Sequence, residues 1–117
     1  MIEVIIFKRD WKVEMMESIE QKAFRIISAA GDSLSMMLET LKYSRNGDFE
    51  EAERLMQKAD ELLLQAHKAQ TELIVEESRG NKSEYSVLMV HAQDHIMNAM
   101  LAKPLIKEII NLYRRLS

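Results

Sequence analysis

The residues best suited to chemistry stand close together in the last third of the chain. His91, Asp94 and His95 are spaced at i, i+3 and i+4, so a helix places all three on one face. A neutral imidazole acts near pH 7 as a nucleophile or as a metal ligand, and a carboxylate pairs with a cation or binds a metal. The spacing therefore fits a nucleophilic histidine, a metal site or a local ion pair.

The three histidines of the chain leave several interpretations open. A histidine on a helix is most often a satisfied polar group, and His91 and His95 each allow that interpretation. Two histidines four residues apart also resemble half of a zinc site, but no glutamate base adjoins the first one and no distant third ligand is evident. No serine partner completes a hydrolase triad. We interpret the third histidine, His67, as a hydrogen-bonded structural residue at the edge of an apolar helix face.

Asp94 is unusual because it stands in a line of apolar residues. On a helix this line consists of Val87, Val90, Met97 and Leu101. An isolated buried charge is costly, so a carboxylate in the line must be neutralised, paired or bound to a metal. Two interpretations stay open from spacing alone: a local pair with a histidine or with a lysine of another helix, and a metal ligand.

Three long segments with helical periodicity must position these residues. Apolar residues step by three and four over residues 13–45, 48–77 and 83–116, which predicts three helices. Gly31 lies on the apolar face of the first helix without shifting its phase. We expect this glycine to allow close approach of another helix, at a cost of about 1 kcal/mol in helix propensity relative to alanine.

The turns between these segments carry local signals. Gly47, in the run Asn46-Gly47-Asp48, suits the left-handed position just after a helix end. Asp48, with Glu51 three residues later, predicts a capping box for the second helix. Ser83 is predicted to cap the third helix.

The third predicted helix is apolar on nearly every side between Val87 and Leu101. Such a helix is surrounded by others, and the two remaining helices of one chain do not suffice to surround it. The pattern therefore predicts association between copies. Pro104 falls inside the pattern, but the apolar period continues beyond it, so we expect a kink rather than an end.

Composition limits the class of protein. A chain of 117 residues predicts one domain (1–117), and 3 Gly with 1 Pro are too few for the turns of an all-β protein of this size. The absence of cysteine excludes disulfides, thiolate zinc sites and cysteine nucleophiles. A net charge of −3, with lysines and arginines scattered, argues against nucleic-acid binding.

Residues 1–12 are the part of the chain hardest to interpret. Their apolar run is too short, and too soon followed by charges, for a signal peptide or a membrane span. They extend the first helix or form an arm against a neighbour. We expect a cytoplasmic protein without direct membrane insertion.

Four stretches of the sequence together resemble one known family. The block 90–97, Val-His-Ala-Gln-Asp-His-Ile-Met, is similar to the signature of the IIA component, lactose/cellobiose type, of the bacterial phosphoenolpyruvate-dependent sugar phosphotransferase system. Residues 66–71, 46–49 and 30–32 resemble further motifs of that family. The resemblance covers residues 15–116, nearly the whole chain.

The resemblance implies an all-α protomer, a three-helix antiparallel up-down bundle, that assembles as a nine-helix trimer. It implies a phosphotransferase component that receives a phosphoryl group from the phosphohistidine of HPr and passes it to a cysteine of the cognate IIB component. The sugars implied are cellobiose, chitobiose or lactose-like disaccharides. The amino-acid sequence of residues 89–95 resembles the cellobiose and chitobiose members more than the lactose members.

The resemblance also assigns roles to residues by matching position. It makes His91 the phosphorylated residue, and Asp94 the residue whose copies meet on the three-fold axis around a divalent metal, for which magnesium is the expected ion. His95 matches a position close to the phosphorylation site. The chain departs from the family at Leu34, where an arginine is usual, and at Pro104, where an acidic residue is more frequent.

Two hypotheses from other classes compete with a phosphocarrier. One is a metal-binding helical bundle in which His91, Asp94 and His95 are ligands, with His67 as a further candidate. The other is a non-catalytic helical interaction module, which predicts that His91→Ala leaves function intact.

Overall fold

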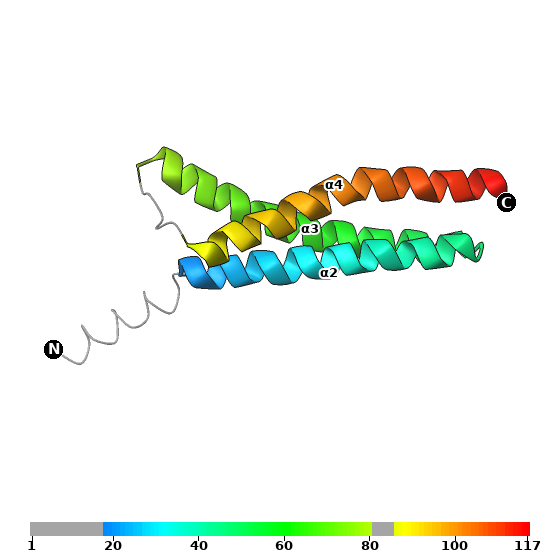
Figure 1. The fold of residues 1–117 in the computed structure, drawn as a ribbon, viewed down its shortest axis with the longest axis horizontal. Helices are drawn as coiled ribbons and strands as arrows, with labels where there is room; N and C mark the ends of the chain where they lie inside the picture. The colour runs from blue at the N-terminus through cyan, green and yellow to red at the C-terminus, as the bar shows by residue number, and fades with distance from the viewer. Residues whose placement is uncertain (1–17, 81–85) are drawn as a thin grey trace.

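The computed structural model describes residues 18–80 and 86–117, which form three helices and no strand. In chain order these are α2 (Ile19–Arg45), α3 (Phe49–Ser78) and α4 (Val87–Leu116). Successive helices run in opposite directions (Figure 1). The predicted all-α, three-helix antiparallel bundle is therefore confirmed. Within the described part of the chain, none of the helices has a stretch long and apolar enough to cross a membrane.

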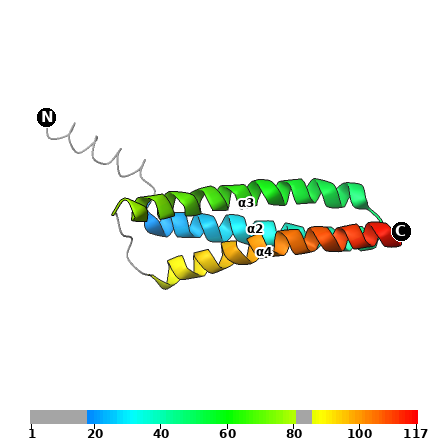
Figure 2. The ribbon, with the colours of Figure 1, turned by 90° about the horizontal axis from the view of Figure 1, so that it is seen from above.

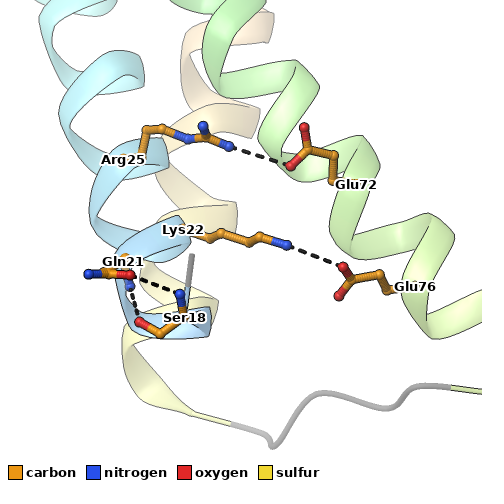
Figure 3. Close-up of polar contacts among 6 residues, drawn as sticks. All are labelled: Ser18, Gln21, Lys22, Arg25, Glu72 and Glu76. Atoms are coloured by element: carbon orange, nitrogen blue, oxygen red, sulfur yellow. Dashed lines mark hydrogen bonds and ion pairs between the residues drawn. The ribbon is translucent and has the colours of Figure 1, made fainter. Parts of the chain in front are cut away.

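The first helix begins later than its periodicity predicted. Ser18 is its N-cap, with an extended backbone (ψ 163°), so α2 starts at Ile19 rather than at residue 13. The Ser18 hydroxyl accepts a hydrogen bond from the Gln21 amide at 3.1 Å, and the Gln21 side chain accepts one from the Ser18 amide at 2.9 Å (Figure 3). This reciprocal capping box fixes the helix start. The arm or extension expected over residues 1–12 lies outside the described residues.

The turn between α2 and α3 has the expected glycine geometry and half of the expected capping box. Gly47 has a φ of +82°, the left-handed conformation that favours glycine. The Asp48 side chain accepts from the Glu51 amide at 3.3 Å. The Glu51 carboxylate pairs with Arg54 instead of returning to the Asp48 backbone. That hydrogen bond, aided by the charge of Arg54, lowers the pKa of Glu51.

The third helix also begins later than predicted. Ser86 is its N-cap, and the Ser86 hydroxyl accepts from the Met89 amide at 3.1 Å. The helix therefore starts at Val87 rather than at residue 83, and the predicted cap Ser83 lies outside the described residues. The helix continues through Pro104. Figure 1 shows it changing direction between its yellow N-terminal half and its red C-terminal half, in line with the expected kink.

The core is built around α2, which packs against both other helices, whereas α3 and α4 contact each other much less (Figures 1 and 2). Alanines at many contact positions let the helix axes approach closely. The buried core includes Ala23, Ile26, Ala30 and Met37 of α2, Ala59, Leu63, Ala66 and Ala69 of α3, and Ala92, Ile96, Ala99 and Ile106 of α4. Ser33 is fully buried among them because its hydroxyl donates to the Ala59 carbonyl at 2.7 Å.

Polar pairs link α3 to each of its neighbours. Near the N-terminal end of α2, Lys22 pairs with Glu76 at 3.3 Å and Arg25 pairs with Glu72 at 3.5 Å (Figure 3). Towards the middle of α4, Lys103 pairs with Asp60 at 2.8 Å. Figure 1 shows the C-terminal end of α3 diverging from both other helices, and the two ion pairs still connect it to α2.

Candidate functional site: the histidine pair of α4

The structure brings His91 and His95 into direct contact on α4. Their Nε2 atoms are 3.1 Å apart, and the two rings meet edge to face with centroids 4.4 Å apart and planes at 84°. His91 is exposed and His95 is half-buried. The i, i+4 spacing on a regular helix produces this proximity, because such positions lie one turn apart on the same face.

A hydrogen bond between two imidazole nitrogens requires one donor and one acceptor. When His95 carries its proton on Nε2, that N–H donates to His91 and leaves the His91 nitrogen unprotonated. A neutral imidazole nitrogen at the surface is a nucleophile that a large electrophile can reach. In this tautomer the lone pair of His91 Nε2 accepts the His95 N–H at 3.1 Å, and it is free to act as a nucleophile once the His95 N–H turns to another acceptor.

Gly31 of α2 lies near His95, a proximity that the sequence did not reveal. A Cβ atom built on Gly31 would lie 3.9 Å from Nδ1 of His95, which is an ordinary van der Waals distance. Gly31 was expected to allow close approach of another helix. The neighbouring atom of α4 at this position is Nδ1 of the His95 ring, not a backbone atom. Leu34, at the position where an arginine was expected, is partly buried and packs against the core.

A second unpredicted contact ties α4 to α3 near the histidines. The Gln70 side-chain amide donates to the Gln93 side-chain oxygen at 2.6 Å and lies 4.0 Å from the Met97 sulfur. Gln70 is only 7% exposed, although it is polar. Its position on the core face of α3, between Ala66 and Leu73, was the available signal, because a buried amide needs a partner.

Asp94 lies on the outside of the protomer. Its carboxylate is exposed and has no ion pair or hydrogen bond within residues 18–80 and 86–117. The local pair with a histidine or lysine, one of the two interpretations, is therefore absent among the described residues. The apolar line around Asp94 is also exposed, and we call it the α4 stripe. It consists of Val87, Val90, Met97, Leu101, Leu105 and Leu112, with exposures from 46% for Val90 to 83% for Val87.

The three histidines do not form one cluster. His67 lies on α3, where it lines a surface hollow of about 390 Å³ together with Leu64, Met100 and Lys103. Its backbone carbonyl accepts from the Thr71 hydroxyl at 2.9 Å, but its exposed ring makes no hydrogen bond within the described residues. The interpretation of this ring as hydrogen-bonded is therefore not supported.

The geometry also weighs against the metal-binding bundle. Among the residues that the structure describes, no group of three or more histidine, aspartate or glutamate side chains is arranged to hold a metal ion. His91, Asp94 and His95 share a helix face without converging on one point, and His67 lies on another helix. A metal site that uses Asp94 therefore needs ligands from outside the described residues.

Comparison with known proteins gives one consistent result. Residues 21–114 match the family model described as "PTS system, Lactose/Cellobiose specific IIA subunit". The lichenan-specific phosphotransferase enzyme IIA component of Bacillus subtilis is 47% identical over 103 residues, which cover 88% of this chain and 94% of that protein. The lactose-specific EIIA component of Staphylococcus epidermidis is 39% identical over 99 residues, covering 85% and 95%.

Solved structures show the same relationship in three dimensions. The cellobiose-specific enzyme IIA from Bacillus anthracis superposes with a TM-score of 0.81 at 42% identity, covering 88% of this chain and 95% of that one. The chitobiose IIA protein of Escherichia coli, solved in complex with HPr, gives a TM-score of 0.75 at 36% identity, covering 86% and 98%. With the family model spanning most of the three-helix bundle, this chain belongs to the lactose/cellobiose-specific IIA components of the sugar phosphotransferase system.

Proposed function

We propose that the protein is a phosphocarrier of sugar uptake that accepts a phosphoryl group on His91. The donor is the phosphohistidine of HPr, and the acceptor is a cysteine of the cognate IIB component. The observation that carries this proposal is the exposed His91 ring, whose Nε2 lies 3.1 Å from Nε2 of His95. Exposure matters because both donor and acceptor are side chains of other proteins, so the reacting nitrogen must be reachable from outside.

The comparisons support the choice of donor and the class of sugar. A relative with 36% identity, the chitobiose IIA protein, has been solved in complex with HPr. Relatives named for lactose, cellobiose and lichenan support a cargo of disaccharides such as cellobiose, chitobiose or lactose-like sugars. The membrane component selects the sugar, so this chain is proposed to serve the class rather than one member.

The transfer is an exchange of one nitrogen–phosphorus bond for another. The unprotonated His91 nitrogen attacks the phosphorus of phospho-HPr, a bond to His91 forms, and the bond to the HPr imidazole breaks. In the second transfer the IIB cysteine thiolate attacks the same phosphorus, and His91 leaves with the bonding electron pair and takes up a proton. Such transfers need positioning and charge stabilisation more than further covalent chemistry.

The structure limits where the stabilising donors come from. The helix starts at Val87, and the Met89 and Val90 amides are bonded to Ser86. The free amides of the helix start therefore lie before His91 and are not placed to hold its phosphoryl group. The N–H of His95, the nearest side-chain donor, is proposed to bond the phosphoryl oxygens.

We propose in addition that three copies assemble around the α4 stripe. The stripe is an apolar surface that one chain leaves exposed, with a single carboxylate at Asp94. Three such carboxylates near an axis repel by about 4 kcal/mol per pair at about 4 Å and an effective dielectric of about 20. A divalent cation removes this repulsion, and oxygen-only ligands completed by water suit magnesium. This ion is structural and takes no part in phosphoryl transfer.

The test is phosphorylation in a reconstituted system. The protein is incubated with phosphoenolpyruvate, enzyme I and HPr, and acid-labile phosphate is mapped to a residue. Phosphate on His91 supports the proposal. Phosphate on His67 or His95 in the wild type contradicts the assignment, and no acid-labile phosphate with active enzyme I and HPr contradicts the phosphocarrier function.

A further inference from the structure

We propose that Gly31 is a positioning residue for the histidine pair. Because it has no side chain, it leaves free the space beside α2 in which the His95 ring lies, and this directs Nε2 of His95 towards His91. The inference deepens the proposed function and rests on it for its kinetic consequence. Its structural consequence is independent of phosphoryl transfer.

The argument begins with the two nitrogens of the His95 ring. On one side, Nδ1 lies 3.9 Å from the point where a Cβ of Gly31 would be. On the other side, Nε2 lies 3.1 Å from Nε2 of His91. The ring therefore spans the space between the backbone of α2 and the proposed nucleophile. A side chain that extends beyond Cβ into the first space would displace the second contact.

The burial of the two rings agrees with this arrangement. His95 is half-buried and His91 is exposed, although both lie on the same face of α4. On α2, Ile27 and Leu34 lie one turn before and after Gly31, and both are partly buried against the core. Gly31 is thus a gap in a row of larger side chains, at the level of the His95 ring.

The contact distance predicts which side chains the gap accepts. An alanine adds only the Cβ, at an ordinary van der Waals distance, and should keep the ring in place. A leucine adds three further carbons to the same gap. Helical histidines have few side-chain rotamers, so a His95 ring that loses this space must swing to another one and carry its Nε2 away from His91.

The experiment compares Gly31→Ala, Gly31→Leu and Ser28→Leu. Ser28 is exposed one turn earlier on α2, so its variant adds the same side chain to the same helix at another position. Imidazole nitrogen NMR and ring-to-ring nuclear Overhauser effects report the pair, without phosphate. Rates of transfer from phospho-HPr give kcat and KM. Circular dichroism and sedimentation report folding and assembly.

We expect Gly31→Ala and Ser28→Leu to keep the wild-type ring signals and a kcat within about twofold. Gly31→Leu should lose the ring-to-ring effect and lower kcat about 10-fold to 100-fold, with KM for HPr little changed, because misplaced donors chiefly slow the chemical step. A Gly31→Leu protein with the wild-type ring pair and kcat would overturn the inference. Equal losses in Ser28→Leu would overturn it as well.

A double variant covers the case in which Gly31→Leu folds poorly. If the new leucine and the His95 ring compete for one space, adding His95→Ala to Gly31→Leu should restore folding. A double variant no more stable than the single one contradicts the competition. If wild-type His91 accepts no phosphate, the proposed function fails, whereas the ring signals still decide the role of Gly31.

Discussion

At the scale of single residues, the site depends on an unequal pair of histidines. His91 is exposed and is proposed to form the bond to phosphorus, whereas His95 is half-buried and is proposed to donate to the phosphoryl oxygens. Residue type alone does not distinguish the two imidazoles. Their surroundings do, because the His95 ring is half-buried next to Gly31 of α2, whereas the His91 ring is exposed.

Substitution by glutamine should separate these roles. We expect His91→Gln to abolish phosphate acceptance, since no nucleophilic nitrogen remains. His95→Gln should still accept, but about 100-fold more slowly, because one donor to the developing charge is altered. His67→Gln, the matched control on α3, should accept at the wild-type rate. Single-turnover transfer from labelled phospho-HPr measures all three, and rapid acceptance by His91→Gln would contradict the assignment.

The sequence was enough to predict which residues form the site, but not all of their neighbours in space. Helical spacing was enough to place His91 and His95 together, because i and i+4 positions are neighbours on any regular helix. Gly31 and His95 are 64 residues apart in the sequence, and their proximity depends on the distance between the axes of α2 and α4. Local periodicity carries no information on that distance.

At the scale of the helices, the bundle is held by capped ends and by a few polar ties between α3 and its neighbours. The sequence predicted the three helices and the Gly47 turn, and it placed two of the helix starts too early. Apolar periodicity runs past the caps in both cases, whereas a cap is set by one side chain reaching one amide, as Ser18 and Ser86 do. At the third helix, Ser83 and Ser86 both stand near the boundary and spacing did not single one out, whereas Ser18 is the one serine near the start of the first helix.

Breaking the Gln70–Gln93 hydrogen bond should cost stability, and a second substitution should recover most of it. Gln70→Leu leaves the half-buried Gln93 amide without its partner and should lower the free energy of unfolding by about 1–3 kcal/mol. Adding Gln93→Leu should recover most of that loss, because both polar groups are then gone. Urea unfolding of the single and double variants measures the effect. Lys103→Met, which breaks the ion pair with Asp60, is the control and should cost less than about 1 kcal/mol.

Removing the N-cap of α3 should lower the free energy of unfolding by less than the loss of the Gln70–Gln93 hydrogen bond does. Asp48→Ala removes the side chain that accepts from the Glu51 amide and should lower the free energy of unfolding by about 1 kcal/mol. Asp48→Asn should keep most of the stability, since asparagine also caps helices. Thermal unfolding of the two variants compares them, and equal losses would show that the charge of Asp48, rather than its cap, stabilises the turn.

At the scale of the whole molecule, the α4 stripe is the feature that one chain leaves unexplained. Six large apolar residues and Asp94 share a surface that the other described helices do not cover. The all-round apolar pattern of α4 was visible in the sequence and predicted association. The number of copies was not visible, because a stripe predicts a partner and not how many copies surround it.

Replacing Asp94 should show whether assembly depends on the metal ion. Removing a charge from an apolar surface that assembly buries is often neutral or stabilising, so in the proposed trimer Asp94→Leu should stay trimeric and lose both its divalent ion and its sensitivity to chelator. The wild-type trimer should weaken when chelator removes the ion, because the carboxylates then repel. Sedimentation with and without chelator, together with metal analysis, measures these outcomes.

A matched control keeps that result specific. Glu61→Leu replaces an exposed carboxylate of α3 that lies off the α4 stripe, and it should keep both the ion and the response to chelator. A monomeric Asp94→Leu, or a wild-type trimer indifferent to chelator, would show that the axial metal site is wrong.

The short turn at Gly47 also sets the order in which the molecule can fold. Residues 46–48 join α2 and α3 into a hairpin whose contacts are close in sequence, and such contacts form fastest. Synthesis proceeds from the N-terminus, so this hairpin leaves the ribosome before α4 is complete. The last helix then docks onto a preformed surface of α2. The histidine pair and the α4 stripe are therefore completed together, in the final step, so the chain displays this exposed apolar stripe only after α2 and α3 have formed a hairpin.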